Sequence, residues 1–171
     1  MREQILKKIL FFLHRLGDMC IIVGESGGEM FFGHKELTID DKLRLVLPAN
    51  YRDGFVGGKA YAFLGFDHCI ALYPEETYQK MMEKVLALPD FDPKARNVKR
   101  NYLYNTFDLP IDSHNRILLP KSLVDHTKMG KKVVVAGSGD HLEIWDEEAF
   151  AKNMDDIGST FSEDAQSLLS H

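Results

Sequence analysis

Short apolar runs separated by turn residues follow one another along the central part of the chain. Proline or glycine comes directly after most of these runs, a pattern typical of short strands joined in hairpins. In the last run Leu142 and Ile144 alternate with polar or aromatic residues, which predicts a strand with one buried face. The predicted strands cover residues 45–47, 59–64, 69–73, 117–119, 132–136 and 141–145.

Segments with helical periodicity follow both groups of runs. Pro74 suits the first position of a helix, and apolar side chains then recur every three or four residues up to Leu86. Asp146 is the expected N-cap of a matching helix, with Phe150 and Met154 on its apolar side. The methionines and aromatic residues of these stripes are interpreted as core packing rather than as a ligand site.

A third helix is predicted between the two groups, because Asp92 followed by proline is a typical helix start. This segment is basic, and such a charge run is typical of a solvated face. A DNA-facing edge is the alternative that the sequence leaves open. The basic residues are Lys94, Arg96, Lys99 and Arg100.

The strongest signal is an internal repeat without gaps, in which residues 44–48 return as residues 116–120. A gapless match of this length indicates a tandem duplication. Because a unit of short strands cannot bury its own apolar face, the two copies are expected to pack about a pseudo-two-fold axis. The other matched pairs are Asp40 with Asp112, Asp53 with Asp125, Gly65 with Gly137, and Tyr73 with Trp145.

The net charge of −5 is unevenly distributed along the 171 residues. Residues 140–171 contain nine acidic residues and one lysine, whereas residues 30–139 have an excess of basic over acidic residues. A modestly basic central body is compatible with phosphate contact, with the acidic end facing away from DNA. No uninterrupted apolar run approaches the roughly 18 residues of a membrane span, so we expect a cytoplasmic protein without membrane contact.

The cysteines and histidines give no indication of a metal site. Cys20 and Cys69 are far apart in the sequence, which argues against a disulfide framework and a structural zinc site, and we expect both to be buried. The seven histidines are scattered. We expect no metal, no cofactor and no small-molecule substrate.

The repeated turn carries the candidate chemistry. Asp40 and Arg44 have the same spacing as Asp112 and Arg116, and within a tight turn the carboxylate can bond backbone donors while the guanidinium projects outward. A structural ion pair is the simplest interpretation of one copy. Two projecting arginines also suit phosphate and guanine-edge contact, with Lys42 beside the first and His114 beside the second.

The residues named here resemble the MraZ family, in a match that extends from Met30 to about Asp156. The resemblance implies AbrB-type domains, ring-shaped homo-oligomers, and binding to short repeated DNA elements upstream of the cell-division and cell-wall genes. It also implies that Asp40, Arg44, Asp112 and Arg116 form the DNA-contacting turns. The segments that carry the resemblance are residues 30–34, 38–48, 111–120 and 142–146.

We therefore expect an α+β fold, a duplicated swapped-hairpin AbrB-like β-barrel with peripheral helices. The expected protein is a sequence-specific, nucleoid-associated transcriptional regulator, acting as a repressor on double-stranded DNA, and not an enzyme. The expected divisions are an extension at residues 1–29, SpoVT-AbrB-type domains at 34–76 and 105–148, a helical linker at 77–104, and an acidic helix and tail at 149–171.

Two features depart from the family pattern. The family has glycine before each arginine, where this chain has Leu43 and Asn115. Asparagine tolerates a positive φ but leucine does not, so we expect the first turn to bend differently. Residues 1–29 precede the family pattern, and they are either translated from upstream of the native start or form a genuine amphipathic helix at residues 5–16.

Three alternative functions match parts of the sequence. Paired Asp40 and Asp112 suggest an aspartic protease, but adjacent arginines would hold both carboxylates ionised and the required Asp-Thr/Ser-Gly turn is missing. A phosphate-binding loop at residues 57–59 lacks the first glycine and the final serine or threonine. An AbrB-like antitoxin or oligomeric interaction module without its own operator is the alternative that stays open.

Overall fold

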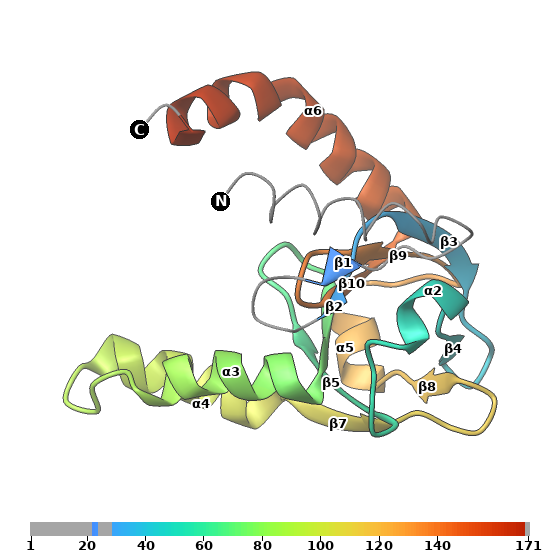
Figure 1. Ribbon diagram of the computed structural model, residues 1–171, viewed down its shortest axis with the longest axis horizontal. Helices are drawn as coiled ribbons and strands as arrows, with labels where there is room; N and C mark the ends of the chain where they lie inside the picture. Colours follow the sequence, from blue (N-terminus) through green and yellow to red (C-terminus); the bar gives the residue numbers. More distant parts are fainter. Residues whose placement is uncertain (1–21, 24–28, 170–171) are drawn as a thin grey trace, which may run out of the picture.

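The computed structural model describes residues 22–23 and 29–169 of the chain. The helix expected at residues 5–16 and Cys20 lie outside the described residues. The fold is a mixture of helices and antiparallel strands, which confirms the predicted α+β class (Figure 1). No described helix is long and apolar enough to cross a membrane.

Six strands form one antiparallel sheet in the order β3-β9-β10-β6-β5-β7. Among the described strands, β3 and β7 are the two edges of this sheet. A two-residue pair, β1 (Ile22–Val23) with β2 (Glu29–Met30), precedes it. The sheet strands are β3 (His34–Thr38), β5 (Lys59–Leu64), β6 (Ile70–Pro74), β7 (Phe107–Pro110), β9 (Lys132–Gly137) and β10 (Leu142–Asp146).

The two halves of the chain contribute strands to each other. From the first half, β3 pairs with β9 of the second half, and from the second half β7 pairs with β5 of the first. The strands that follow the two repeated turns, β4 (Arg44–Val46) and β8 (Arg116–Leu118), pair antiparallel with each other and form a separate two-stranded ribbon. The repeated segments are therefore in direct contact.

One continuous core lies between the six-stranded sheet and the β4–β8 ribbon. Leu45 and Ile117 of the ribbon are fully buried, as are Leu142 and Ile144 of β10, which confirms the predicted buried face of that strand. Cys69 is also buried, as predicted, and burial raises the pKa of its thiol to about 12.

Two short helices follow the prolines that end the ribbon strands, α2 (Ala49–Arg52) and α5 (Lys121–His126). Three longer helices lie outside the core: α3 (Glu75–Leu86), α4 (Pro93–Asn105) and α6 (Glu147–Leu169). Asp92 caps α4 by accepting a 2.8 Å hydrogen bond from the Lys94 backbone N–H. Asp146 accepts a 3.0 Å bond from Glu148 N–H, so both predicted helix starts are confirmed.

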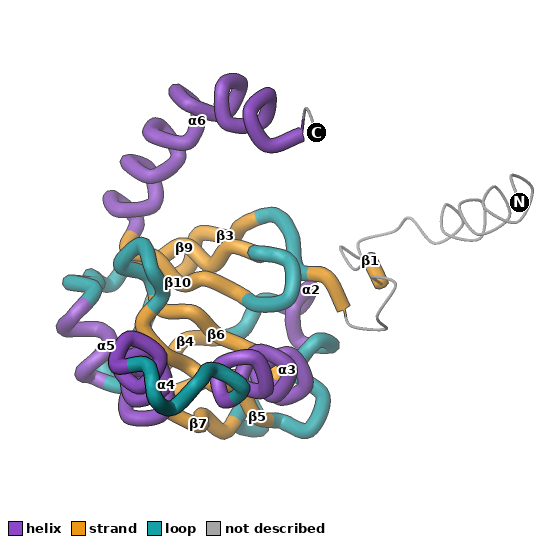
Figure 2. Tube along the Cα trace, turned by 90° about the vertical axis from the view of Figure 1, so that its left-hand side faces the viewer, coloured by secondary structure: helices purple, strands orange, loops and turns teal. Residues whose placement is uncertain are grey.

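The helices α3 and α4 pack against each other and project from the body as an arm (Figure 1). The root of this arm is anchored on the sheet, because Tyr78 stacks on Tyr61 at 4.2 Å and Tyr102 packs on Phe63 at 5.2 Å. Figure 2 shows the arm and α6 at opposite ends of the sheet. The predicted core packing holds for Met82 of α3, which is buried, but it is wrong for Leu86 of α3 and Met154 of α6, which are 52% and 47% exposed.

Candidate nucleic-acid interface

The first repeated turn is held together by the Asp40 carboxylate. Its Oδ1 atom accepts hydrogen bonds of 2.9 Å from the backbone N–H groups of Lys42 and Arg44. Its Oδ2 atom accepts from the Arg44 Nε at 2.7 Å and lies 2.6 Å from Arg44 Nη2. A single carboxylate therefore shapes the backbone of the turn and orients the arginine.

The second turn repeats this arrangement. Asp112 Oδ1 accepts from the backbone N–H groups of His114 at 2.8 Å and Arg116 at 3.0 Å. Asp112 Oδ2 lies 2.8 Å from both Nε and Nη2 of Arg116. In both turns the arginine Nη1 group makes no hydrogen bond within the described residues, so its two N–H donors are available to an external acceptor.

The expectation that the first turn bends differently is wrong. Leu43 adopts a φ of 60° and Asn115 a φ of 57°, so the two turns share one left-handed backbone conformation. The reason is tertiary: the Leu43 carbonyl accepts a 2.9 Å hydrogen bond from Leu119 N–H, and the Leu43 side chain packs against the core. These contacts offset the steric cost of about 1–2 kcal/mol that a leucine has in this conformation.

Pairing of β4 with β8 brings the two arginines onto one outward surface. Leu45 and Ile117 are direct partners and point into the core. Because side chains alternate along a strand, Arg44 and Arg116 point outward together with their neighbours two residues further along. Val46 and Leu118, which are 45% and 58% exposed, stand opposite Arg116 and Arg44 respectively. The surface thus combines two guanidinium groups with two exposed apolar side chains.

The arginines keep both carboxyl groups ionised. The hydrogen bond from the Arg44 guanidinium, followed by those from the turn backbone, lowers the pKa of Asp40 to about 2. For Asp112 the backbone N–H of Arg116 is the main cause of a lowered pKa, and the guanidinium adds to it. Each turn is therefore a charged pair at neutral pH, which opposes the protease alternative because that chemistry needs one protonated carboxyl.

The other predicted residues lie on the exposed parts of the same turns. Lys42 and His114 are both exposed, at matching positions two residues after the aspartates. Sequence reasoning missed Lys131, whose Nζ lies 2.6 Å from Asp41 Oδ1 and so adds a cation beside the first turn. The repeat pairs Lys131 with Lys59, which is the signal that could have drawn attention to it.

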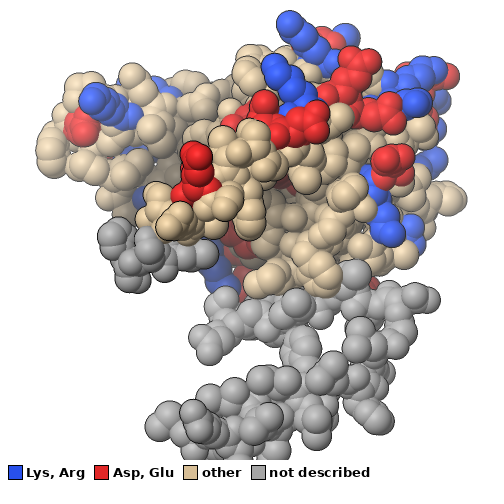
Figure 3. Space-filling model, turned by 90° about the horizontal axis from the view of Figure 1, so that it is seen from above, with Lys and Arg blue, Asp and Glu red and all other residues tan. Residues whose placement is uncertain are grey.

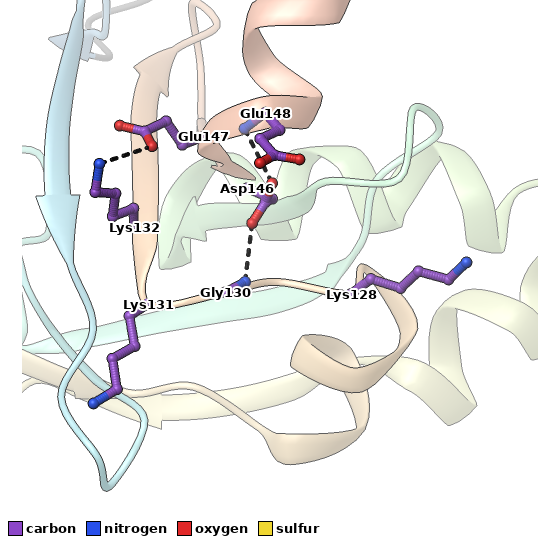
Figure 4. Close-up of a pocket in the computed structure, with 7 residues that line it drawn as sticks. All are labelled: Lys128, Gly130, Lys131, Lys132, Asp146, Glu147 and Glu148. Atoms are coloured by element: carbon purple, nitrogen blue, oxygen red, sulfur yellow. Dashed lines mark hydrogen bonds and ion pairs between the residues drawn. The ribbon is translucent and has the colours of Figure 1, made fainter.

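A shallow groove lies beside the start of α6. Figure 4 shows Asp146 between Gly130 and Glu148, where it accepts hydrogen bonds from both backbone N–H groups. The helix start is therefore already capped by a carboxylate, and Lys132 is paired with Glu147 at 3.3 Å. The described part of the chain contains no cluster of His, Cys, Asp and Glu residues that could hold a metal ion.

Comparison with known proteins gives one family. The profile of the MraZ protein family, which is described as antitoxin-like, matches residues 30–101 and again residues 103–170. This double match supports the internal repeat.

Curated relatives carry the same family name. A protein of Heliobacterium modesticaldum named transcriptional regulator MraZ is 34% identical over 141 residues, which cover 82% of this chain and 97% of the relative. Its namesake in Herpetosiphon aurantiacus is 34% identical over 83% of this chain and 96% of its own length. The protein of the same name in Cytophaga hutchinsonii is 32% identical over 81% of this chain and 94% of its own length. The chain belongs to the MraZ family.

Proposed function

We propose that this protein is a sequence-specific DNA-binding transcriptional regulator that reads double-stranded DNA with its two arginine turns. The observation that carries the proposal is the outward pair Arg44 and Arg116 on one two-stranded ribbon, each oriented by its own aspartate. An oriented guanidinium can donate to phosphate oxygens or to the O6 and N7 acceptors of guanine. Asp40 and Asp112 set the geometry, while Lys42, His114 and Lys131 are placed to contact phosphates.

The proposed architecture is a duplicated swapped-hairpin β-barrel of the AbrB type with a pseudo-two-fold axis. The exchanged strands β3 and β7 support it, as does the β4–β8 register, which is symmetric about the Leu45–Ile117 pair. In this arrangement residues 34–76 and 105–148 are the two domains, residues 77–104 are the linker, and residues 149–171 are the acidic end.

The names of the relatives support a role in transcription regulation, and the finer cellular role is proposed from the resemblance to the family. The protein is a cytoplasmic, nucleoid-associated repressor that binds short repeated elements upstream of the division and cell-wall gene cluster. It acts as a ring-shaped homo-oligomer, because one chain offers only two arginine turns. Several weak contacts joined in one assembly raise avidity by roughly 10² to 10⁴ without any new contact.

A titration of the full chain with fluorescent DNA from the region upstream of its own gene tests the proposal. We expect binding that is at least tenfold tighter than to a scrambled duplex and that weakens steeply with salt, as phosphate neutralisation requires. Arg44→Ala with Arg116→Ala should abolish the preference. Lys80→Ala is the matched control, because Lys80 is an exposed cation in an ion pair away from the turns.

An antitoxin-like interaction module is the second candidate, and the description of the family profile favours it. Such a module needs no operator of its own. Equal affinity for the upstream and scrambled duplexes would exclude the proposed sequence-specific regulator. The antitoxin-like interaction module would then be the function that remains.

A further inference from the structure

The β4–β8 ribbon presents two apolar side chains that have no part in the core. Val46 is 45% exposed and Leu118 is 58% exposed, whereas the residues that precede them, Leu45 and Ile117, are fully buried. Val46 and Leu118 hold equivalent positions in the internal repeat, each two residues after an arginine. The same exposed apolar side chain therefore occurs in both copies, beside each guanidinium group.

The register of the ribbon places each apolar side chain directly opposite an arginine. Leu118 pairs with Arg44, and Val46 pairs with Arg116. The pairs on either side are joined by backbone hydrogen bonds of 2.9 Å, from Leu119 N–H to the Leu43 carbonyl and from Leu47 N–H to the Asn115 carbonyl. Bonded and non-bonded pairs alternate along an antiparallel ribbon, so both arginine–apolar pairs are non-bonded ones. Such pairs bring their side chains closest together, with Cβ atoms about 5 Å apart.

The charges around the ribbon favour an anionic partner. The carboxylates of the two turns are already paired within the chain, Asp40 with Arg44, Asp112 with Arg116 and Asp41 with Lys131. The ribbon lies low in the body in Figure 1, and the molecule seen from above in Figure 3 shows a band of acidic side chains. The surface with exposed apolar groups is thus the one with guanidinium donors, which suits DNA better than an acidic protein surface.

The major groove of DNA contains one apolar group that such a pair can recognise. The groove is wide enough for a two-stranded ribbon, and thymine places its 5-methyl group there, whereas guanine presents the O6 and N7 acceptors that bind arginine. Successive bases are about 3.4 Å apart along a strand. An apolar side chain about 5 Å from an arginine therefore falls one or two bases away from the guanine that the arginine contacts.

We propose that Val46 and Leu118 determine sequence specificity by packing against thymine 5-methyl groups in the major groove. Leu118 contacts the thymine near the guanine bound by Arg44, and Val46 contacts the thymine near the guanine bound by Arg116. The recognised DNA thus has thymine within one or two bases of guanine at both contacts. This inference rests on the proposed function and identifies the chemical group that its apolar residues recognise.

The test compares duplexes that differ only in the methyl group. DNA from the region upstream of the protein's own gene is prepared with deoxyuridine in place of thymidine, which keeps the base pairing and removes the 5-methyl group. Burial of one methyl group corresponds to about a fourfold change in affinity. With two methyl groups contacted by each chain, the unaltered full-length protein should bind the deoxyuridine duplex roughly fivefold more weakly, or weaker still. Scrambled duplexes of the two kinds should bind equally.

Alanine variants assign the methyl effect to the two side chains. Val46→Ala and Leu118→Ala should each weaken binding to the thymidine duplex by about fourfold. In the double variant the difference between the two duplexes should fall below about twofold, because the group that contacts the methyl is gone. Val98→Ala and Leu103→Ala are the matched controls, since these α4 residues are 42% and 52% exposed and lie on the arm. Both controls should keep the full difference, and circular dichroism melts check that every variant is folded.

The outcomes separate this inference from the proposed function. Equal affinity of the unaltered protein for thymidine and deoxyuridine duplexes, with the preference over scrambled DNA retained, would overturn the inference alone. Equal affinity for upstream and scrambled duplexes would remove the proposed function and the inference with it. A methyl effect of full size in the double variant would assign the effect to DNA shape. A lower mass of that variant in solution would assign the two side chains to contact between copies, and either result overturns the inference.

Discussion

Leu43 and Asn115 occupy equivalent positions in the two repeated turns and share one left-handed backbone, with φ of 60° and 57°. Each carbonyl accepts a 2.9 Å hydrogen bond from the opposite half of the chain, Leu43 from Leu119 and Asn115 from Leu47. The turns are thus fixed by each other's strands. A leucine is held where its own preference would not place it, and the two arginines are presented in the same way.

Substitutions at Asn115 test how much the left-handed conformation matters. Asn115→Val should lower the free energy of unfolding by about 1–2 kcal/mol, because a β-branched side chain is strained at positive φ. Asn115→Gly should change it by less than about 0.5 kcal/mol, because glycine adopts this conformation readily. Urea unfolding of both variants measures the difference, and equal stabilities would show that the turn relaxes around the larger residue.

The equivalence of the turns predicts equal losses of DNA affinity. Arg44→Ala and Arg116→Ala should each weaken operator binding by about 1–3 kcal/mol if each guanidinium contacts a base edge. Both arginines form partly exposed ion pairs, so the thermal melting temperature should barely change. Operator titration beside a thermal melt gives both quantities. A large loss in only one variant would show that the two turns contact DNA differently despite their common geometry.

The orientation of the arginines by aspartate is testable separately. Asp40→Asn retains an acceptor for the backbone N–H groups but removes the charge that binds Arg44. We expect weaker operator binding with the same number of phosphates neutralised. The slope of log affinity against log salt concentration should therefore stay close to that of the unaltered protein. Arg44→Lys is the matched comparison, because it keeps the charge and loses the planar fork. Unaltered affinity in both would remove the aspartate–arginine geometry from recognition.

His141, the residue directly before β10, makes stability depend on pH. Burial alone would lower the pKa of His141, but hydrogen bonds to Glu143 and Asp140 outweigh it and the pKa is raised. The protonated ring therefore stabilises the fold below the ordinary histidine pKa, and this contribution is lost as pH rises through the raised value. The free energy of unfolding should therefore fall as pH rises from below the ordinary histidine pKa through the raised pKa of His141. Glu143→Gln should flatten that dependence.

Local patterns predicted the hairpins and helix starts but not the exchange between halves. The strand at residues 59–64 and the caps Asp92 and Asp146 follow from turn residues and alternation, and the structure has them as expected. The strand β3 (His34–Thr38) is mostly exposed and has no apolar alternation. It exists because β9, almost 100 residues later, supplies its hydrogen bonds, and no local pattern contains that information.

The same distinction applies to the candidate site. Asp40 with Arg44, and Asp112 with Arg116, are four residues apart, so the repeat alone predicted both pairs. The ion pair of Lys131 with Asp41 joins opposite halves of the chain and became visible only in the fold. The steric preference of Leu43 led to a wrong expectation, because a conformational cost of about 1–2 kcal/mol is outweighed by tertiary hydrogen bonds and packing.

Gly137 and Gly158 give opposite predictions for the same substitution. A Cβ atom at Gly137 would lie 2.3 Å from the Phe32 backbone nitrogen and 2.4 Å from the Phe31 carbonyl carbon. That contact is with backbone, and the segment cannot withdraw easily because Gly137 N–H donates to Gly33 at 2.8 Å and Phe31 bonds Gly139. Gly137→Ala should therefore lower the free energy of unfolding by about 2–4 kcal/mol through overpacking.

At Gly158, in the exposed part of α6, a Cβ meets nothing within 4 Å, and alanine should add about 0.5–1 kcal/mol of helix stability. Thermal or urea unfolding of the two variants measures both changes in the free energy of unfolding. A Gly137→Ala protein as stable as the unaltered chain would mean that β9 and the segment before β3 are not held in close contact.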